Sequence, residues 1–219
     1  MTELSKGELV ADELACRRGE RLIFTGLSLR IAAGGALLLT GANGSGKSSL
    51  LRVLASLIPP AAGRLVWDGV AVADDPARYR AAIHYVGHLD GIKAALTPRE
   101  TLKFWARSRG ARGAIADALA AFGLATAADW PCRWLSAGQR RRLALARLIA
   151  APAPIWLLDE PTAALDADGE ERLAAAIESH RAGGGRIVIA THQPVSIGAA
   201  ETLALADFAP PPCALGDDF

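Results

Sequence analysis

A glycine-rich segment followed by lysine and serine carries the clearest chemistry in this chain of 219 residues. It runs from Gly41 to Ser49 and fits the pattern G-x-x-x-x-G-K-[ST]. Glycine lets the backbone wrap closely around phosphate, because a residue without Cβ adopts the required dihedral angles at little cost. A helix that follows directs its unpaired N–H groups and the positive end of its dipole at the same anion. The segment therefore predicts a nucleoside triphosphate site, and an ordinary glycine-rich turn is the weaker alternative.

The residues of this segment have separate expected roles. Lys47 would contact the β- and γ-phosphates and is a candidate catalytic residue, and the Ser48 hydroxyl would bind Mg²⁺. The nucleotide-binding residues predicted here are Gly41, Asn43, Gly44, Ser45, Gly46, Lys47, Ser48 and Ser49.

Two acids follow a second apolar run, Ile155 to Leu158. A buried parallel strand that ends in acids places their carboxylates at the carboxyl edge of the sheet, beside the phosphate loop. Asp159 would bind Mg²⁺ directly or through water, with Ser48 as the other protein ligand. Glu160 is suited to polarise the attacking water and is the second catalytic candidate. A strand that merely happens to end in an acidic turn is the alternative, and the phosphate loop makes it the less favoured one.

The third feature is the peptide Leu135-Ser136-Ala137-Gly138-Gln139, which precedes a strongly helical pattern. Ser136 and Gln139 have the spacing of a capping box, so the peptide is predicted to open a helix whose N-terminus could face phosphate. As a helix cap alone, the peptide would be unremarkable.

Short apolar runs that must position these residues alternate with helical patterns. The run Leu37–Thr40 is continuously apolar, as expected of a strand buried on both faces. Leu50, Val53, Leu54 and Leu57 repeat as one face of a helix that Pro59-Pro60 would end. Further strands are predicted at residues 9–15, 22–24, 27–31, 64–67, 83–86, 155–158 and 186–191, and a loop at 74–76.

The middle of the chain is predicted to be helical. Thr97-Pro98-Arg99-Glu100 combines a capping threonine, an N1 proline and a capping-box glutamate, and Gly123 is a plausible end for the next helix. We expect this helical insert, about residues 90–135, to interrupt a core of about residues 1–89 and 136–209 that includes an N-terminal antiparallel sheet. Residues 210–219 would form a loose tail.

Composition excludes several classes of protein. The net charge of +1 gives no global indication of nucleic-acid binding. No apolar stretch approaches the roughly 20 residues that a membrane-spanning helix needs, and residues 1–6 lack the pattern of a signal peptide. Cys16, Cys132 and Cys213 are widely separated and are interpreted as reduced thiols.

The run Arg140-Arg141-Arg142 is interpreted as a solvated helix face rather than an anion or nucleic-acid patch.

Taken together, the phosphate loop, the acidic strand end and Ser136-Ala137-Gly138-Gln139 resemble the motifs of ATP-binding-cassette (ABC) ATPases. Asp166, in Ala164-Leu165-Asp166, lies where that family has its D-loop, a part of the nucleotide site. His192 ends a strand pattern where the family has its switch histidine. Alone it would more often be structural, but the resemblance implies that it senses the γ-phosphate in catalysis. A small P-loop kinase would need neither His192 nor the Ser136 peptide.

The resemblance implies an α/β P-loop NTPase fold with a parallel core sheet, an N-terminal antiparallel β subdomain and an inserted helical subdomain. It implies ATP and Mg²⁺ as ligands and a head-to-tail homodimer, in which Ser136, Gly138 and Gln139 of one subunit complete the ATP site of the other. The helical insert would contact integral-membrane ABC subunits. The chain would then be a peripheral protein on the cytoplasmic face of the inner (cell) membrane, with no nucleic-acid partner.

The chain departs from the family pattern at three positions. Arg18 stands where an aromatic residue usually stacks on adenine, and a guanidinium can also stack on a base. His88 stands where the Q-loop glutamine is expected. Histidine can hydrogen-bond water or Mg²⁺ ligands, so His88 is a candidate metal-site residue, with coupling that can depend on pH. Ala137 replaces the commoner glycine.

Within the family, the chain resembles the ATP-binding subunits of cytochrome c biogenesis, or haem-exporter, complexes. The resemblance rests on Tyr85-Val86-Gly87-His88, Gly91-Ile92-Lys93 and Thr191-His192-Gln193-Pro194. It implies a translocase-type ATPase that drives a membrane complex handling haem for c-type cytochromes, whether haem or a haem-carrying chaperone is acted on. The alternative is the ATPase subunit of an exporter for another substrate. No direct haem binding is expected, since the histidines form no obvious axial pair.

Overall fold

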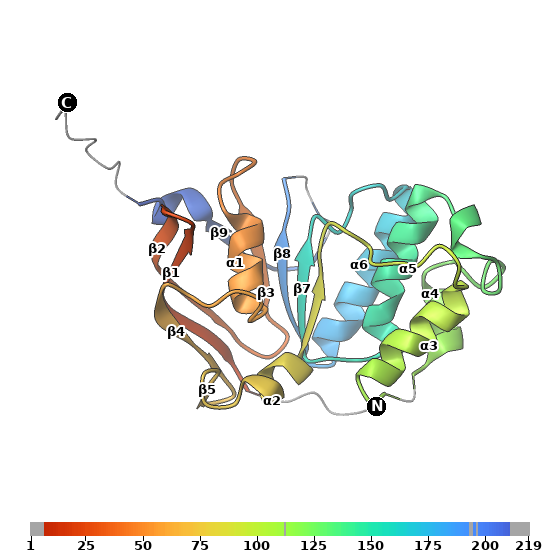
Figure 1. Cartoon of the computed structure of the whole chain (residues 1–219), viewed down its shortest axis with the longest axis horizontal. Helices are drawn as coiled ribbons and strands as arrows, with labels where there is room; N and C mark the ends of the chain where they lie inside the picture. The colour runs from red at the N-terminus through yellow and green to blue at the C-terminus, as the bar shows by residue number, and fades with distance from the viewer. Residues whose placement is uncertain (1–6, 112, 193–194, 196, 211–219) are drawn as a thin grey trace.

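Helix α1 (Lys47–Leu54), which begins at the end of the glycine-rich segment, lies between two β-sheets in the computed structural model (Figure 1). The structure describes residues 7–111, 113–192, 195 and 197–210. An antiparallel sheet of four strands lies on one side of α1, and a parallel sheet of five strands lies on the other. Helices α5 (Ala137–Ala150) and α6 (Ala167–Ala182) cover the opposite face of the parallel sheet. The predicted α/β P-loop NTPase architecture is confirmed.

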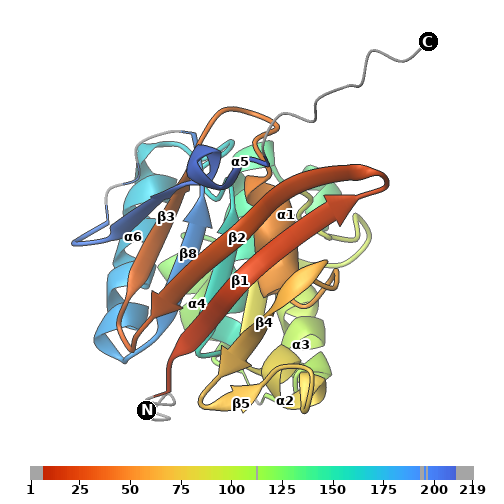
Figure 2. The same ribbon diagram turned by 90° about the vertical axis from the view of Figure 1, so that its left-hand side faces the viewer.

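The antiparallel sheet has the order β2-β1-β4-β5 and is seen in front of α1 in Figure 2. Its strands are β1 (Leu9–Arg18), β2 (Arg21–Ile31), β4 (Ala62–Trp67) and β5 (Val70–Ala71). The prediction of two separate strands at 22–24 and 27–31 was wrong, because β2 is continuous. Its pairing with β1 passes through an irregularity near Gly26, whose φ of 67° lies in the left-handed region that favours glycine.

The parallel sheet has the order β6-β7-β8-β3-β9. Its strands are β3 (Ala36–Thr40), β6 (Ile83–Val86), β7 (Ile155–Asp159), β8 (Arg186–Ala190) and β9 (Glu201–Ala204), and β9 was not predicted. The pairs β3–β8 and β7–β8 are both parallel, so β3 and β7 end at the same edge of the sheet. The glycine-rich segment follows β3, and the two acids lie at the end of β7, so this edge brings them together.

Side chains of β7 alternate between two hydrophobic cores. Ile155 and Leu157 face the core that contains α1 and the antiparallel sheet. Trp156 and Leu158 face the core that α5 and α6 cover. Each fully buried large aliphatic side chain contributes about 1.5–3 kcal/mol relative to an exposed one. Burial on both faces explains the continuous apolar pattern of this strand and fixes the position of the acids that end it.

Helix α1 ends earlier than the apolar repeat predicted. Ser56 has a φ of 54°, and the N–H of Leu57 donates to the carbonyl oxygen of Arg52 at 2.9 Å, which is the six-to-one hydrogen bond of a Schellman ending. Leu57 is 59% exposed and does not continue the buried face. The helix therefore stops before Pro59-Pro60, contrary to the prediction.

The segment between strand β6 and helix α5 is helical, as predicted. Its helices are α3 (Pro98–Ser108), α4 (Ile115–Ala121) and the 3-10 turn η1 (Cys132–Trp134). Helix α2 (Pro76–Ala81) replaces part of the predicted 74–76 loop, since the Asp75 side chain caps it, and a second 3-10 turn is η2 (Leu205–Phe208). The division into subdomains stays a prediction. Nearly all of the expected loose tail, residues 211–219, lies outside the described residues.

Candidate nucleotide site

A cavity of about 340 Å³ opens at the edge of the parallel sheet, above the glycine-rich segment. It is lined by Arg18, Ile23, Asn43, Gly44, Gly46, Lys47, Ser48, Ser49 and Glu160. Arg18 comes from the end of β1, and Glu160 follows β7, so three distant parts of the chain meet here. All but Ile23 are residues that the sequence predicted for the nucleotide site.

The glycine-rich segment has no room for side chains at two of its glycines. Gly41 has a φ of 141°, and a Cβ there would lie 2.8 Å from Ser45 Oγ. Gly46 has a φ of 106°, and a Cβ there would lie 2.5 Å from Ile23 Cγ2. The loop conformation thus requires glycine at both positions.

Lys47 folds back across the glycine-rich segment. Its Nζ donates to the carbonyl oxygens of Gly41 at 2.7 Å and Ala42 at 3.1 Å. The residue is only 7% exposed, and the two carbonyl acceptors hold the buried ammonium group at the base of the cavity. A phosphate group bound in the loop would meet this positive charge together with the N-terminal N–H groups of α1.

The predicted metal ligands meet at the end of β7. Ser48 Oγ donates to Asp159 Oδ1 at 3.0 Å, and the Tyr85 hydroxyl contacts Oδ2 of the same carboxylate at 3.4 Å. Burial raises the pKa of Tyr85 above its ordinary value, so the phenol stays protonated as a donor at neutral pH. A hydroxyl and a carboxylate oxygen are hard donors of the kind that Mg²⁺ prefers, and Mg²⁺ commonly takes few protein ligands. Ser48 and Asp159 therefore fit the ion.

The two remaining catalytic candidates form a pair. His192 Nδ1 lies 2.9 Å from Glu160 Oε1, with side chains 51% and 21% exposed. Because a carboxylate only accepts, the Nδ1 atom is the donor of this bond. Glu160 has a φ of 47°, which is uncommon for a residue with a side chain, and its N–H donates to the carbonyl oxygen of Ala190 at 2.8 Å. The backbone at Glu160 is thus held in a strained turn directly after the strand.

Arg141, which sequence reasoning assigned to a solvated face, is in fact buried beneath this turn. Its side chain is 4% exposed. Its guanidinium donates to the carbonyl oxygens of Asp159 at 3.0 Å, Glu160 at 2.7 Å and Pro161 at 3.2 Å. It also donates to the carbonyl oxygen of Gly87 at 2.9 Å and to Asp90 Oδ1 at 3.2 Å. Arg141 therefore fastens the acidic strand end to the segment after β6.

A pattern in the sequence could have identified Arg141 as buried. Leu145 and Leu148 lie four and seven residues after it on α5, and both belong to the core. A charged residue in register with a buried apolar face requires internal hydrogen-bond partners. The neighbouring arginines of the run, Arg140 and Arg142, are only partly buried.

Arg147, also on α5, supports the same region. Burial, with a contribution from Arg141, lowers its pKa to about 10, so it remains charged at neutral pH. Its guanidinium lies 5.1 Å from the centre of the Trp105 ring and donates to the carbonyl oxygen of Tyr85 at 3.0 Å. This contact ties α5 to β6 next to the metal-ligand candidates.

The peptide before α5 folds as the predicted capping box. Ser136 Oγ accepts from the N–H of Gln139 at 3.1 Å, and Gln139 Oε1 accepts from the N–H of Ser136 at 2.9 Å. Gly138 lies against the D-loop candidate, because a Cβ there would be 3.0 Å from the carbonyl oxygen of Ala164. The Asp166 side chain caps α6 by accepting from the N–H of Gly169 at 2.9 Å. None of Ser136, Gly138, Gln139 and Asp166 lines the cavity above the glycine-rich segment.

The two unusual positions, Arg18 and His88, have different surroundings. Arg18 lines the cavity beside Ile23, as a base-stacking residue would. His88 is exposed, and it makes no hydrogen bond or ion pair within the part of the chain that the structure describes. Its assignment to the metal site stays a prediction. Across the described residues, no group of three or more His, Cys, Asp and Glu side chains is arranged to hold a metal ion.

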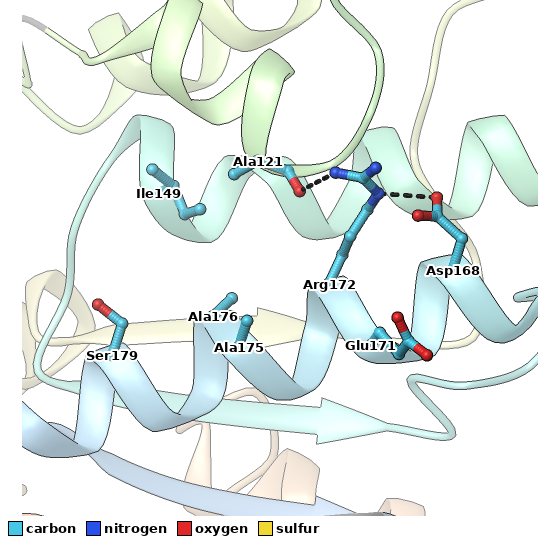
Figure 3. A pocket seen from close by; sticks show the side chains of 8 residues that line it. All are labelled: Ala121, Ile149, Asp168, Glu171, Arg172, Ala175, Ala176 and Ser179. Atoms are coloured by element: carbon cyan, nitrogen blue, oxygen red, sulfur yellow. Dashed lines mark hydrogen bonds and ion pairs between the residues drawn. The ribbon is translucent and has the colours of Figure 1, made fainter.

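A second cavity, of about 560 Å³, lies away from this site between α6, α5 and the end of α4 (Figure 3). Arg172 crosses it, donating to Asp168 Oδ2 at 2.7 Å and to the carbonyl oxygen of Ala121 at 3.2 Å. None of the predicted site residues lines this cavity.

Among the described helices, none is both long and apolar enough to cross a membrane.

Comparisons with known proteins agree with this geometry. Residues 24–163 match the family described as ABC transporter. The chain is 59% identical to the cytochrome c biogenesis ATP-binding export protein CcmA of Rhodospirillum rubrum, over 92% of this chain and 87% of the relative. It is 49% identical to the CcmA protein of Paramagnetospirillum magneticum, over 94% and 97%. A solved ABC transporter ATP-binding protein of Pyrococcus furiosus has a TM-score of 0.82 at 21% identity, covering 93% of this chain and all of that one.

Proposed function

This chain belongs to the ABC transporter family, and we propose that it is the ATP-hydrolysing subunit of a membrane complex that acts in the maturation of c-type cytochromes. The proposal of ATP hydrolysis rests on one observation. The contact between Ser48 and Asp159 and the contact between Glu160 and His192 lie at the edge of the same cavity. The cytochrome part is supported by the names of the relatives at 59% and 49% identity.

In this proposal, the chain's own residues divide the work of hydrolysis. Lys47 and the N–H groups of the loop bind the phosphates of ATP. Glu160 accepts a proton from the attacking water, and the 2.9 Å contact with His192 orients its carboxylate. Mg²⁺, held by Ser48 and Asp159, would neutralise charge on the phosphate oxygens.

The position of the peptide that begins α5 supports a head-to-tail homodimer. Ser136, Gly138 and Gln139 lie outside their own subunit's cavity, at the N-terminus of α5. In the proposed dimer they would face the γ-phosphate bound by the other subunit, where a helix N-terminus stabilises negative charge. Closing and reopening of this dimer would transmit the energy of hydrolysis to integral-membrane subunits. The chain would act at the cytoplasmic face of the inner membrane as a peripheral protein.

The test of the cellular role uses cells whose only copy of the gene carries Glu160→Gln. We expect a selective loss of haem-stained c-type cytochromes, while b-type cytochromes stay at the level of the parent strain. Purified Glu160→Gln protein should bind ATP, hydrolyse it at least about 100-fold more slowly and accumulate as a dimer. Normal c-type haem alongside lost ATPase activity would favour an exporter of another substrate. Normal turnover would remove Glu160 from its proposed role.

A further inference from the structure

Tyr85 contacts the metal-ligand carboxylate from the side opposite Ser48. Its hydroxyl donates to Asp159 Oδ2 at 3.4 Å, while Ser48 Oγ donates to Oδ1 at 3.0 Å. Each oxygen of this carboxylate therefore has its own donor. Asp159 is only 4% exposed, so water has little access to replace either contact.

We propose that Tyr85 is a positioning residue, which orients the Asp159 carboxylate for a divalent cation at the nucleotide site. This inference rests on the proposed function. A donor on Oδ2 restricts rotation of the carboxylate about its Cβ–Cγ bond and keeps Oδ1 next to Ser48 Oγ. The phenol is neutral, so it fixes the carboxylate without competing with the cation for its charge. Partners that orient a metal ligand in this way typically change metal affinity by about 10- to 100-fold when removed.

The backbone of Tyr85 is held by two contacts, and the backbone of Gly87 lies against its ring. Tyr85 pairs with Leu157 in the parallel sheet, and Arg147 donates to its carbonyl oxygen at 3.0 Å. The backbone of Gly87 packs directly on the ring, since a Cβ there would lie 3.1 Å from both the Tyr85 hydroxyl oxygen and Cε1. Arg141 donates to the carbonyl oxygen of Gly87 at 2.9 Å and so fixes this segment. These contacts fix the backbone from which the Tyr85 side chain extends to Asp159.

The chain contains only one other tyrosine, and it provides a matched control. Tyr79 is 1% exposed, and its hydroxyl donates to the carbonyl oxygen of Leu54 at 2.6 Å. It lies on α2 and contacts neither Asp159 nor the cavity. Tyr85→Phe and Tyr79→Phe therefore each remove one hydroxyl group from a tyrosine that donates one hydrogen bond. They differ in that the acceptor of the Tyr85 hydroxyl is a metal ligand and that this hydroxyl also interacts with the Arg52 side chain.

The experiment measures binding of a fluorescent, non-hydrolysable ATP analogue to the full-length protein, first in EDTA and then at increasing Mg²⁺ concentrations. For Tyr85→Phe we expect unchanged affinity in EDTA and an increase of about tenfold in the Mg²⁺ concentration needed for half of the full enhancement. This tenfold increase is the lower end of the 10- to 100-fold range, because the 3.4 Å contact between Tyr85 and Asp159 is long. Tyr79→Phe should titrate like the parent protein, although it should unfold at lower urea concentration.

Three other results would contradict the proposal in distinguishable ways. If the parent protein binds the analogue with no Mg²⁺ dependence, the proposed function and this inference both fail. If the parent depends on Mg²⁺ and Tyr85→Phe titrates in the same way, only the role of Tyr85 is overturned. If the Mg²⁺ concentration for half enhancement rises equally in both tyrosine variants, the effect is a general loss of rigidity, and Tyr85 has no particular role at the metal site.

Discussion

Replacing Arg141 with lysine keeps the positive charge beneath the acidic strand end. It removes the planar guanidinium group, whose N–H groups reach several separate acceptors. In the parent protein the guanidinium donates to five oxygen atoms, four of them main-chain carbonyl oxygens. The carbonyl oxygens of Asp159 and Glu160 are among them, and Glu160 sits in a turn with a φ of 47°. The substitution therefore tests whether a buried arginine holds this turn.

The expected loss of stability follows from counting donors. A lysine ammonium group has three N–H donors at one point, so at least two of the five acceptors lose their partner. A buried acceptor without a partner costs about 1–3 kcal/mol, which gives about 2–6 kcal/mol in total. The Asp90 side chain is 27% exposed, and water can replace its contact. At least one main-chain acceptor is then left without a donor, so we expect Arg141→Lys to lower the free energy of unfolding by about 1–3 kcal/mol.

The neighbouring Arg142 offers a matched control on the same helix. It pairs with Asp168 Oδ2 at 3.2 Å, and the Asp168 side chain is 53% exposed, so Arg142→Lys should cost less than about 1 kcal/mol. Urea denaturation gives both values, and steady-state ATPase assays show whether the turn matters for chemistry. Arg141→Lys should lower kcat more than about tenfold with little change in ATP affinity, because the glycine-rich loop is untouched. Equal losses in the two lysine variants would refute the reasoning.

Two other predictions concern nucleotide selection and pH. Arg18→Ala should weaken binding of ATP by about three- to tenfold if the guanidinium stacks on the base, and equilibrium binding that matches the parent protein would place adenine elsewhere. Burial lowers the pKa of His84 to about 3, so between about pH 3 and 6.5 the unfolded chain binds more protons at this position than the folded one. Stability should therefore fall as the pH falls through this window, with His84 accounting for about 2 kcal/mol between pH 7 and 5. Urea denaturation at both pH values should show a smaller pH dependence in His84→Gln, whereas an unchanged dependence would show that this histidine is not the cause.

The sequence predicted the parts of the site that depend on neighbours along the chain. The glycine-rich segment lies between β3 and α1 as expected, because glycine dihedrals and a helix N-terminus are local properties. The capping box at Ser136 and Gln139 was predicted for the same reason. Where the chain folds by non-local pairing, the prediction was less successful. Two strands were predicted in place of β2, because the strand continues beyond Gly26 only through its irregular pairing with β1.

Sequence alone determined the fold class and the residue types available for phosphate and metal binding, since the motifs are contiguous and their chemistry is intrinsic. Only the tertiary structure showed that Arg141 is buried beneath Asp159 and Glu160, and that the Tyr85 hydroxyl contacts the metal-ligand carboxylate. Arg141 and Asp159 are 18 residues apart in sequence, and Tyr85 and Asp159 are 74 apart. The apolar repeat on α5 indicates that Arg141 is buried, but the partners of Arg141 and Tyr85 depend on strand order and on how α5 packs against the sheet, which no local pattern specifies.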